Sequence, residues 1–208
     1  MFSKLLAKQL SGPSQVWGQL IFAPMWNRRN AALNYLTLMK LDLQADDRVL
    51  EIGFGGGYLL GQMLPSAGSV AGVDVSDAMV DFCGKRYRKF IQSGKLELKK
   101  GVAENLPYAS GQFTKVCSVN SIFYWQDAKQ ALQECWRVLR ESGQCFLCFT
   151  SRESLLTRSF SQHGLTLYEG DDIVRILREV GFDEISIEQA QDQHRVFWCI
   201  KGRKPAGI

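Results

Sequence analysis

Four residues that could bind a ligand stand together early in the chain. Glu51 is followed by glycines at alternate positions, Gly53, Gly55 and Gly57, and the apolar run before them is typical of a buried strand that ends in a tight turn. Glycine leaves the backbone bare, so a ligand can approach it closely. About 20 residues later Asp74 closes a second apolar run, where a carboxylate can accept both hydroxyls of a ribose. The spacing predicts a nucleoside-containing cofactor across the carboxyl ends of two strands.

The glycine spacing separates two classes of nucleoside cofactor. Dinucleotide-binding loops carry G-x-G-x-x-G. Counted from Gly53 or from Gly55, the third glycine would fall at Tyr58 or Leu60, and neither is glycine. The pattern is instead E-x-G-x-G-x-G, which resembles the first motif of the class I S-adenosylmethionine-dependent methyltransferases. In that family the loop surrounds the methionine and ribose of the cofactor and needs no phosphate site. The alternative is a glycine-rich turn without a ligand.

The resemblance continues beyond the first motif. Gly101 to Trp125 is similar to the family's segment from the third strand to the loop after the fourth, and Ala131 to Phe149 is similar to the next helix and the fifth strand. Motifs in register cover residues 48 to 150. The nearest branch looks like the small enzymes related to the quinone and sterol methyltransferases. The resemblance implies S-adenosyl-L-methionine as cofactor, and the aromatic residues 123–125 with the apolar N-terminal segment suggest a small, apolar methyl acceptor, such as a quinone-like ring or a lipid.

Composition and charge narrow the class of protein further. A chain of 208 residues suits one well-buried domain. The net charge of +4 comes from dispersed basic residues, which disfavours a nucleic-acid partner. No apolar run reaches the ~20 residues of a membrane span, and the N-terminus is too interrupted by lysine for a secretion signal. We therefore expect a cytoplasmic protein.

Six cysteines lie in apolar patterns, which predicts buried thiols and not disulfides. Cys145 and Cys148 form a C-x-x-C, but it lies within a predicted strand. Residues three apart on a strand point to opposite faces, so the two thiols are poorly placed to share a metal or a disulfide. No other spacing indicates a metal site.

Strand and helix patterns alternate along the chain, which predicts a parallel sheet covered on both faces. The expected strands are residues 48–53, 69–75, 96–101, 113–120 and 143–150, and the expected helices are residues 57–64, 77–92, 127–140 and 171–180. Asp77 and Asp127 stand where helix N-caps should be, and Gly94 and Gly143 just past helix ends. The last two strand-like runs, 184–188 and 195–201, leave no room for a helix between them and should pair antiparallel. The resemblance implies a Rossmann-like α/β fold, with a seven-stranded, mostly parallel sheet of order 3-2-1-4-5-7-6 whose last strand is antiparallel.

The N-terminal segment, residues 1–42, is expected to form a helical lid on a methyltransferase domain of residues 43–208. Its predicted helices are residues 2–10 and 27–41. Trp17, Phe22, Met25 and Trp26 make the segment too apolar for a free tail. The alternative is an amphipathic helix that contacts a membrane surface.

The resemblance assigns the cofactor site residue by residue. Glu51 orders the loop, Asp74 holds the ribose, and the loop backbone at Gly53, Phe54, Gly55 and Gly57 lies against the methionine part. The adenine would be flanked by Val75, Ser76 and Met79, although plain helix packing explains Met79 equally well. The family often shows G-D-A where this chain has Val102 and Ala103 after Gly101. The side chain of Val102 accepts no hydrogen bond, which leaves the backbone there, or Glu104, to read the adenine edge.

The motif NSIFYW, from Asn120 to Trp125, follows the fourth strand and in the family passes beside the transferable methyl group. Asn120 is expected at the cofactor, and the apolar acceptor is expected against Trp17, Phe123, Tyr124 and Trp125. The alternative for each aromatic residue is a place in the core.

Direct methyl transfer mainly requires alignment of donor and acceptor, and a base only if the acceptor must lose a proton. Weak candidates for that base are Tyr124, His163 and Glu169. Glu134 and Arg137, one helical turn apart, are expected to form a structural brace. Two other functions remain open, a non-catalytic S-adenosylmethionine-binding regulator and, less favoured, a nicotinamide-dependent oxidoreductase.

Overall fold

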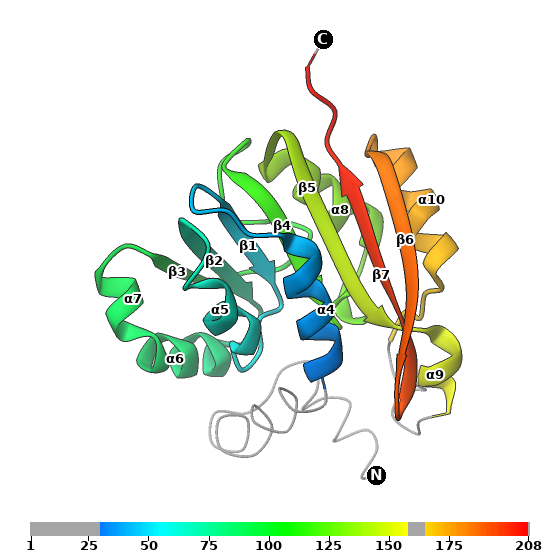
Figure 1. Cartoon of the computed structure of the whole chain (residues 1–208), viewed down its shortest axis with the longest axis horizontal. Helices are drawn as coiled ribbons and strands as arrows, with labels where there is room; N and C mark the ends of the chain where they lie inside the picture. Colours follow the sequence, from blue (N-terminus) through cyan, green and yellow to red (C-terminus); the bar gives the residue numbers. More distant parts are fainter. Residues whose placement is uncertain (1–29, 158–164, 208) are drawn as a thin grey trace.

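A seven-stranded sheet of order β3-β2-β1-β4-β5-β7-β6 forms the centre of the molecule, as Figure 1 shows. The computed structural model describes residues 30–157 and 165–207. Strands β1 to β5 run parallel, and β7 pairs antiparallel with both β5 and β6. The predicted strand order and the antiparallel last strand are therefore confirmed. No helix in the described part of the chain is long and apolar enough to span a membrane.

The elements follow one another in strand–helix alternation. The strands are β1 Arg48–Ile52, β2 Ser69–Asp74, β3 Leu96–Lys100, β4 Phe113–Val119, β5 Leu139–Thr150, β6 Asp183–Asp192 and β7 Arg195–Arg203. The helices are α4 Ala31–Leu41, α5 Tyr58–Met63, α6 Asp77–Arg86, α7 Arg88–Gln92, the 3-10 turn η2 Ile122–Tyr124, α8 Ala128–Val138, α9 Arg152–Leu156 and α10 Gly170–Val180.

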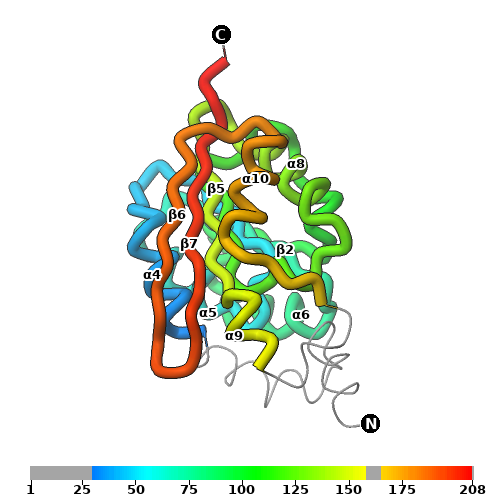
Figure 2. Tube along the Cα trace, turned by 90° about the vertical axis from the view of Figure 1, so that its right-hand side faces the viewer, coloured from blue at the N-terminus to red at the C-terminus, as the bar shows by residue number. Residues whose placement is uncertain are grey.

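Helices cover both faces of the sheet, and Figure 2 shows α4 on one side and α8 and α10 on the other. Side chains alternate along β1, so Val49 packs with α4, α5 and α6 while Leu50 packs with α8 and α10. The central strands are buried on both faces, which explains their continuous apolar sequences. Because β1 to β5 run parallel, their carboxyl ends lie at the same edge of the sheet.

Several predicted boundaries differ from the structure. The helix expected over residues 77–92 breaks at Tyr87 into α6 and α7. Ser76 is the residue before α6, so Asp77 begins the helix and does not cap it. Asp127 does cap α8, with its carboxylate accepting hydrogen bonds from the backbone N–H groups of Lys129 and Gln130. The fifth strand begins at Leu139, so Gly143 lies inside it and not at a helix end.

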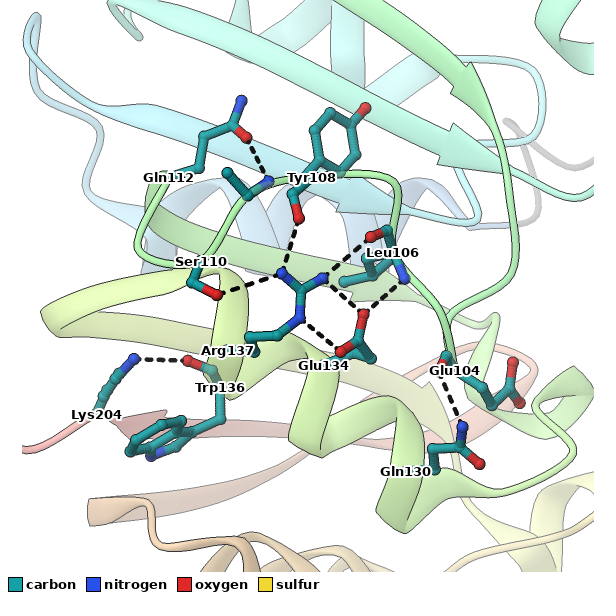
Figure 3. A network of polar contacts seen from close by, with 11 residues as sticks. Glu104, Leu106, Tyr108, Ser110, Gln112, Gln130, Glu134, Trp136, Arg137 and Lys204 are labelled. Atoms are coloured by element: carbon teal, nitrogen blue, oxygen red, sulfur yellow. Dashed lines mark hydrogen bonds and ion pairs between the residues drawn. The ribbon is translucent and has the colours of Figure 1, made fainter.

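The brace expected in α8 is confirmed, as Figure 3 shows. The guanidinium of Arg137 bonds both carboxylate oxygens of Glu134, at 2.6 and 2.7 Å. It also donates to the carbonyls of Tyr108 and Leu106, and Glu134 accepts from the N–H of Leu106 at 2.8 Å. The pair therefore fixes the connection between β3 and β4 to α8.

All six cysteines are free and buried, as the sequence predicts. Cys145 lies on the face covered by α8 with Cys135, and Cys148 lies on the opposite face with Cys199. The C-x-x-C pair is thus split between two cores, as strand geometry requires. No cluster of three or more potential metal ligands occurs in residues 30–157 and 165–207.

The end of the N-terminal segment is part of the layered fold. Helix α4 buries Leu33 and Leu41 and packs against the sheet beside β4, β5 and β7. The predicted helix over residues 2–10, and the part of the expected lid that precedes residue 30, lie outside the described residues.

Candidate functional site

A glycine loop leaves the carboxyl end of β1 and enters α5. Gly53, Gly55 and Gly57 all have positive φ, at 74°, 49° and 69°. Residues with a side chain rarely adopt this left-handed region, so the alternate glycines are required by the backbone of the loop. The sheet neighbours β2 and β4 end on either side of it.

The three glycines face different surroundings. A Cβ atom at Gly53 would lie 2.4 Å from the Cβ of Ser121, and one at Gly57 would lie 2.6 Å from the Sγ of Cys83. A Cβ atom at Gly55 would have no heavy atom of the described residues within 4 Å. Gly53 and Gly57 are therefore bare because protein side chains pack against them. Of the three glycines, Gly55 is the one beside open space where a ligand can approach the backbone.

Asp74 closes the loop from the end of β2. Its carboxylate accepts hydrogen bonds from the backbone N–H of Gly55 at 2.8 Å and of Ser76 at 2.9 Å. Burial raises the pKa of Asp74, and these N–H donors oppose the increase. The carboxylate thus lies directly beneath the open glycine, where sheets of this type bind the sugar of a nucleoside.

Glu51 is a buried carboxyl group with an unpartnered atom. It is 3% exposed, and among the described residues its Oε2 atom has no hydrogen-bond partner. Burial raises the pKa of Glu51 well above its ordinary value, and the nearby Asp74 raises it further. Two adjacent buried acids and an open backbone position fit a ligand that carries positive charge, such as a sulfonium with an amino group.

Two apolar side chains are exposed where the neighbouring strands β2 and β3 end. Val75 is 51% exposed and Val102 is 45% exposed, and their strands pair up to Asp74 and Lys100. Glu104 is already engaged, because its Oε1 atom accepts from the backbone N–H of Gln126 at 2.6 Å. The role of the two exposed valines beside an adenine stays a prediction, while Glu104 is a structural acceptor here.

The side chains of Met79 and Phe54 lie in the core, and the contact expected of Phe54 is through its backbone. Met79 is 1% exposed and packs within the cluster under α5 and α6, so helix packing accounts for it. The ring of Phe54 is also buried, and a Cβ atom on Gly72 would lie 2.7 Å from it. Phe54 can therefore contact a ligand through its backbone only. Ser76 and Ala103 are buried as well.

The loop after β4 lies directly against the glycine loop. The hydroxyl of Ser121 donates to the carbonyl of Ile52 at 3.1 Å. The side chain of Asn120 is turned away to other partners, since its amide donates to Asn30 at 2.8 Å and its oxygen accepts from the N–H of Thr150 at 2.8 Å. Asn120 thus joins the start of α4 to the ends of β4 and β5.

The aromatic residues of the same loop are largely internal. Phe123 and Trp125 are buried, and the ring of Phe123 packs edge-on against Phe149 with centroids 6.3 Å apart. Burial raises the pKa of Tyr124 to about 12. Its phenol is consequently protonated at neutral pH and suits a hydrogen-bond donor better than a base.

Of the other two base candidates, the structure describes Glu169, which is engaged in structural hydrogen bonds. The carboxylate of Glu169 accepts from the indole N–H of Trp198 at 2.9 Å and from the N–H of Glu153 at 3.2 Å, so it holds α9 and β7 together. His163, like the predicted acceptor residue Trp17, lies outside the described residues.

Sequence reasoning missed Cys83, Tyr87 and Ser121, which contact the glycine loop from two sides. The thiol of Cys83 and the hydroxyl of Tyr87 bond to loop carbonyls. Cys83 and Tyr87 are four residues apart in the predicted helix 77–92, so they lie on one face of it, and this spacing is the one sequence signal that could have linked them. Which loop carbonyls they meet is set by the tertiary packing of α6 on α5.

Comparison with known proteins agrees with this geometry. A family model described as a methyltransferase domain matches residues 50–147. The uncharacterized methyltransferase YdaC of Bacillus subtilis is 28% identical over 183 residues, which cover 85% of this chain and 94% of that protein. Demethylmenaquinone methyltransferase of Lactobacillus johnsonii is 32% identical over 116 residues, covering 54% of this chain and 48% of that enzyme.

Solved structures share the fold. Geranyl diphosphate C-methyltransferase from Streptomyces coelicolor, in complex with Mg²⁺, geranyl diphosphate and S-adenosyl-L-homocysteine, superposes with a TM-score of 0.72 at 15% identity. The match covers 86% of this chain and 80% of that one.

Proposed function

Because the chain belongs to the class I S-adenosylmethionine-dependent methyltransferases, we propose that it methylates a small, apolar acceptor by direct displacement. The acceptor class rests on two similarities. One relative is named for demethylmenaquinone, and one structural neighbour is a geranyl diphosphate methyltransferase. A cytoplasmic site of action is part of the proposal, since buried free thiols are typical of a reducing compartment.

The observation that carries this proposal is the contact between the glycine loop after β1 and the loop after β4. Ser121 bonds to Ile52 and packs against Gly53, so a methyl group presented at the glycine loop would meet an acceptor beside the segment after β4. That segment contains Phe123, Tyr124 and Trp125. An acceptor placed there would lie near aromatic side chains, with the protonated Tyr124 phenol as a donor.

The bound cofactor supplies a methyl group on a positively charged sulfur, which is already a good leaving group. The residues of this chain would then bind, orient and exclude water. The Asp74 carboxylate is suited to hold the ribose, and the backbone at Gly55 offers the close approach. Alignment of this kind supplies about 7–11 kcal/mol of a barrier, so a reactive acceptor needs no base from the protein.

The test is a methylation assay with isotopically labelled S-adenosyl-L-methionine. The acceptor panel contains hydroquinones, isoprenoids and fatty acids, with nucleosides and peptides as polar comparisons. We expect label in at least one apolar acceptor, detected by mass spectrometry. Transfer to polar acceptors alone would refute the acceptor class. If the chain binds the cofactor and labels none of the acceptors, the non-catalytic regulator becomes the better description.

We also propose that the segment before α4 closes over the bound cofactor as a lid. The bond between Asn120 and Asn30 places the start of α4 at the carboxyl edge of the sheet, which supports this proposal. A chain shortened to begin near Asn27 should bind cofactor and acceptor more weakly. Unchanged affinity for both would remove the lid, and affinity for lipid vesicles that depends on residues 1–26 would favour a membrane contact.

A further inference from the structure

The side chains of Cys83 in α6 and of Tyr87, the residue that follows α6, bond to the glycine loop. The hydroxyl of Tyr87 donates to the carbonyl of Gly57 at 2.7 Å, and the thiol of Cys83 donates to the carbonyl of Gly55 at 3.5 Å. Burial raises the pKa of both groups, that of Cys83 to about 12. Both groups are therefore neutral donors at physiological pH.

The glycines opposite these side chains make room for them. A Cβ atom at Gly57 would lie 2.6 Å from the Cys83 sulfur and 3.0 Å from the Tyr87 ring. A Cβ atom at Gly61, one turn into α5, would lie 2.5 Å from the Tyr87 hydroxyl oxygen. The chain also leaves helical geometry at Tyr87, where α6 ends and α7 begins. The absence of side chains at Gly57 and Gly61 and the helix break at Tyr87 therefore all allow Tyr87 to pack against the glycine loop and α5.

We propose that Tyr87, together with Cys83, is a positioning residue that holds the cofactor loop in its binding conformation. The inference rests on the proposed cofactor site and extends it to residues that do not line the site. The Cys83 bond to the Gly55 carbonyl holds the peptide next to the Gly55 N–H that bonds Asp74, and the Tyr87 bond to the Gly57 carbonyl holds the end of the same loop. A loop ordered before binding loses less conformational entropy when the ligand arrives.

The test compares Tyr87→Phe with a matched control, Tyr108→Phe. The Tyr108 hydroxyl also donates to a glycine carbonyl, that of Gly72 at 3.1 Å, but that carbonyl belongs to β2 and not to the glycine loop. Titration calorimetry measures the Kd for S-adenosyl-L-homocysteine, and thermal unfolding measures stability. We expect Tyr87→Phe to raise Kd by about 3- to 10-fold, the weight of one hydrogen bond. Tyr108→Phe should lower Tm and leave Kd unchanged.

A second variant, Gly61→Ala, tests the contact between Tyr87 and α5. Gly61→Ala places a methyl group against the Tyr87 hydroxyl and should raise Kd by a similar factor. In the Tyr87→Phe background that hydroxyl is absent and ring contacts of 3.2 and 3.3 Å remain, so Gly61→Ala should raise Kd by a smaller factor than it does in the unaltered chain. Coupling of this kind is expected only for groups in direct contact.

The outcomes separate this inference from the proposed function. If Tyr87→Phe binds S-adenosyl-L-homocysteine as tightly as the unaltered chain, the positioning role is refuted and the cofactor site stands. The same holds if Tyr108→Phe weakens binding equally, or if Gly61→Ala and Tyr87→Phe act additively. No binding by the unaltered chain would refute the cofactor site and this inference together.

Discussion

Asp74 illustrates how one side chain can shape a site and bind within it. Its two oxygens accept N–H groups from Gly55 and Ser76, which links the loop after β1 to the start of α6. A carboxylate has about four lone-pair positions, so acceptor capacity remains for ribose hydroxyls. Substitutions at this position consequently affect loop order and ligand contact at the same time.

We predict that Asp74→Asn raises the Kd for S-adenosyl-L-homocysteine by about 10- to 100-fold, because hydrogen bonds to a charged group are worth about 1.5–3 kcal/mol. Asp77→Asn is the control, since that acid lies one turn away with its side chain 64% exposed. It should leave Kd unchanged. Titration calorimetry measures both, and an unaltered Kd in Asp74→Asn would contradict the ribose role.

Glu51 should couple cofactor binding to proton release. Its pKa in the free protein is raised by burial and by Asp74, and a cationic ligand nearby favours the ionised form. Binding of S-adenosyl-L-methionine should therefore release a proton, and affinity should strengthen as pH rises through the free-state pKa. Calorimetry in buffers of different ionisation enthalpy measures this release, which Glu51→Gln should abolish. Equal proton release in both proteins would show that another group titrates.

At the scale of elements, α8 is joined to the rest of the fold by charge and not by apolar packing alone. Arg137 and Glu134 together bond the segment that contains Leu106 and Tyr108. That segment begins at Val102, so the brace supports the apolar surface next to the cofactor loop. Figure 3 shows that this network also includes the contact of Glu104 with Gln130.

We predict that Glu134→Gln lowers the free energy of unfolding by about 1–2 kcal/mol at neutral pH. The bond to Arg137 lowers the pKa of Glu134. The stabilisation is therefore complete above the unfolded pKa of about 4.3 and is lost as pH falls through the lower folded value. Urea unfolding at several pH values should show the gap between the two proteins closing in acid. A gap independent of pH would rule out this ion pair as its source.

At the scale of the whole molecule, the proposed ligand site lies where β1, β2 and β4 end, at the point where strand order reverses. Loops from both halves of the sheet meet there, as the contact of Ser121 with Ile52 shows. A ligand that bridges them binds the folded state alone. It should therefore stabilise the entire domain.

We predict that S-adenosyl-L-homocysteine at 100 times its Kd stabilises the fold by about 2.7 kcal/mol, which corresponds to a rise in Tm of about 5–10 °C for a domain of this size. NAD at the same concentration should cause no rise, because the loop lacks the third glycine of the dinucleotide motif. Scanning calorimetry measures both. A rise with NAD and none with S-adenosyl-L-homocysteine would reverse the choice of cofactor.

The sequence alone determined the sheet order, the terminal hairpin, the glycine loop and the brace of Glu134 with Arg137. The glycine loop and the brace are local in the chain, and the hairpin follows from two strand patterns that leave no room for a helix between them. The sheet order was implied by the resemblance of the motifs to the methyltransferase family, and the structure confirms it.

Only the tertiary structure decided what surrounds each of those residues. It showed that Gly55 faces open space while Gly57 accommodates Cys83 and Tyr87, and that Glu104 and Asn120 are engaged elsewhere. These contacts join residues that are more than 20 positions apart. Their partners depend on how helices and loops pack across the sheet, and no periodicity within one segment contains that information.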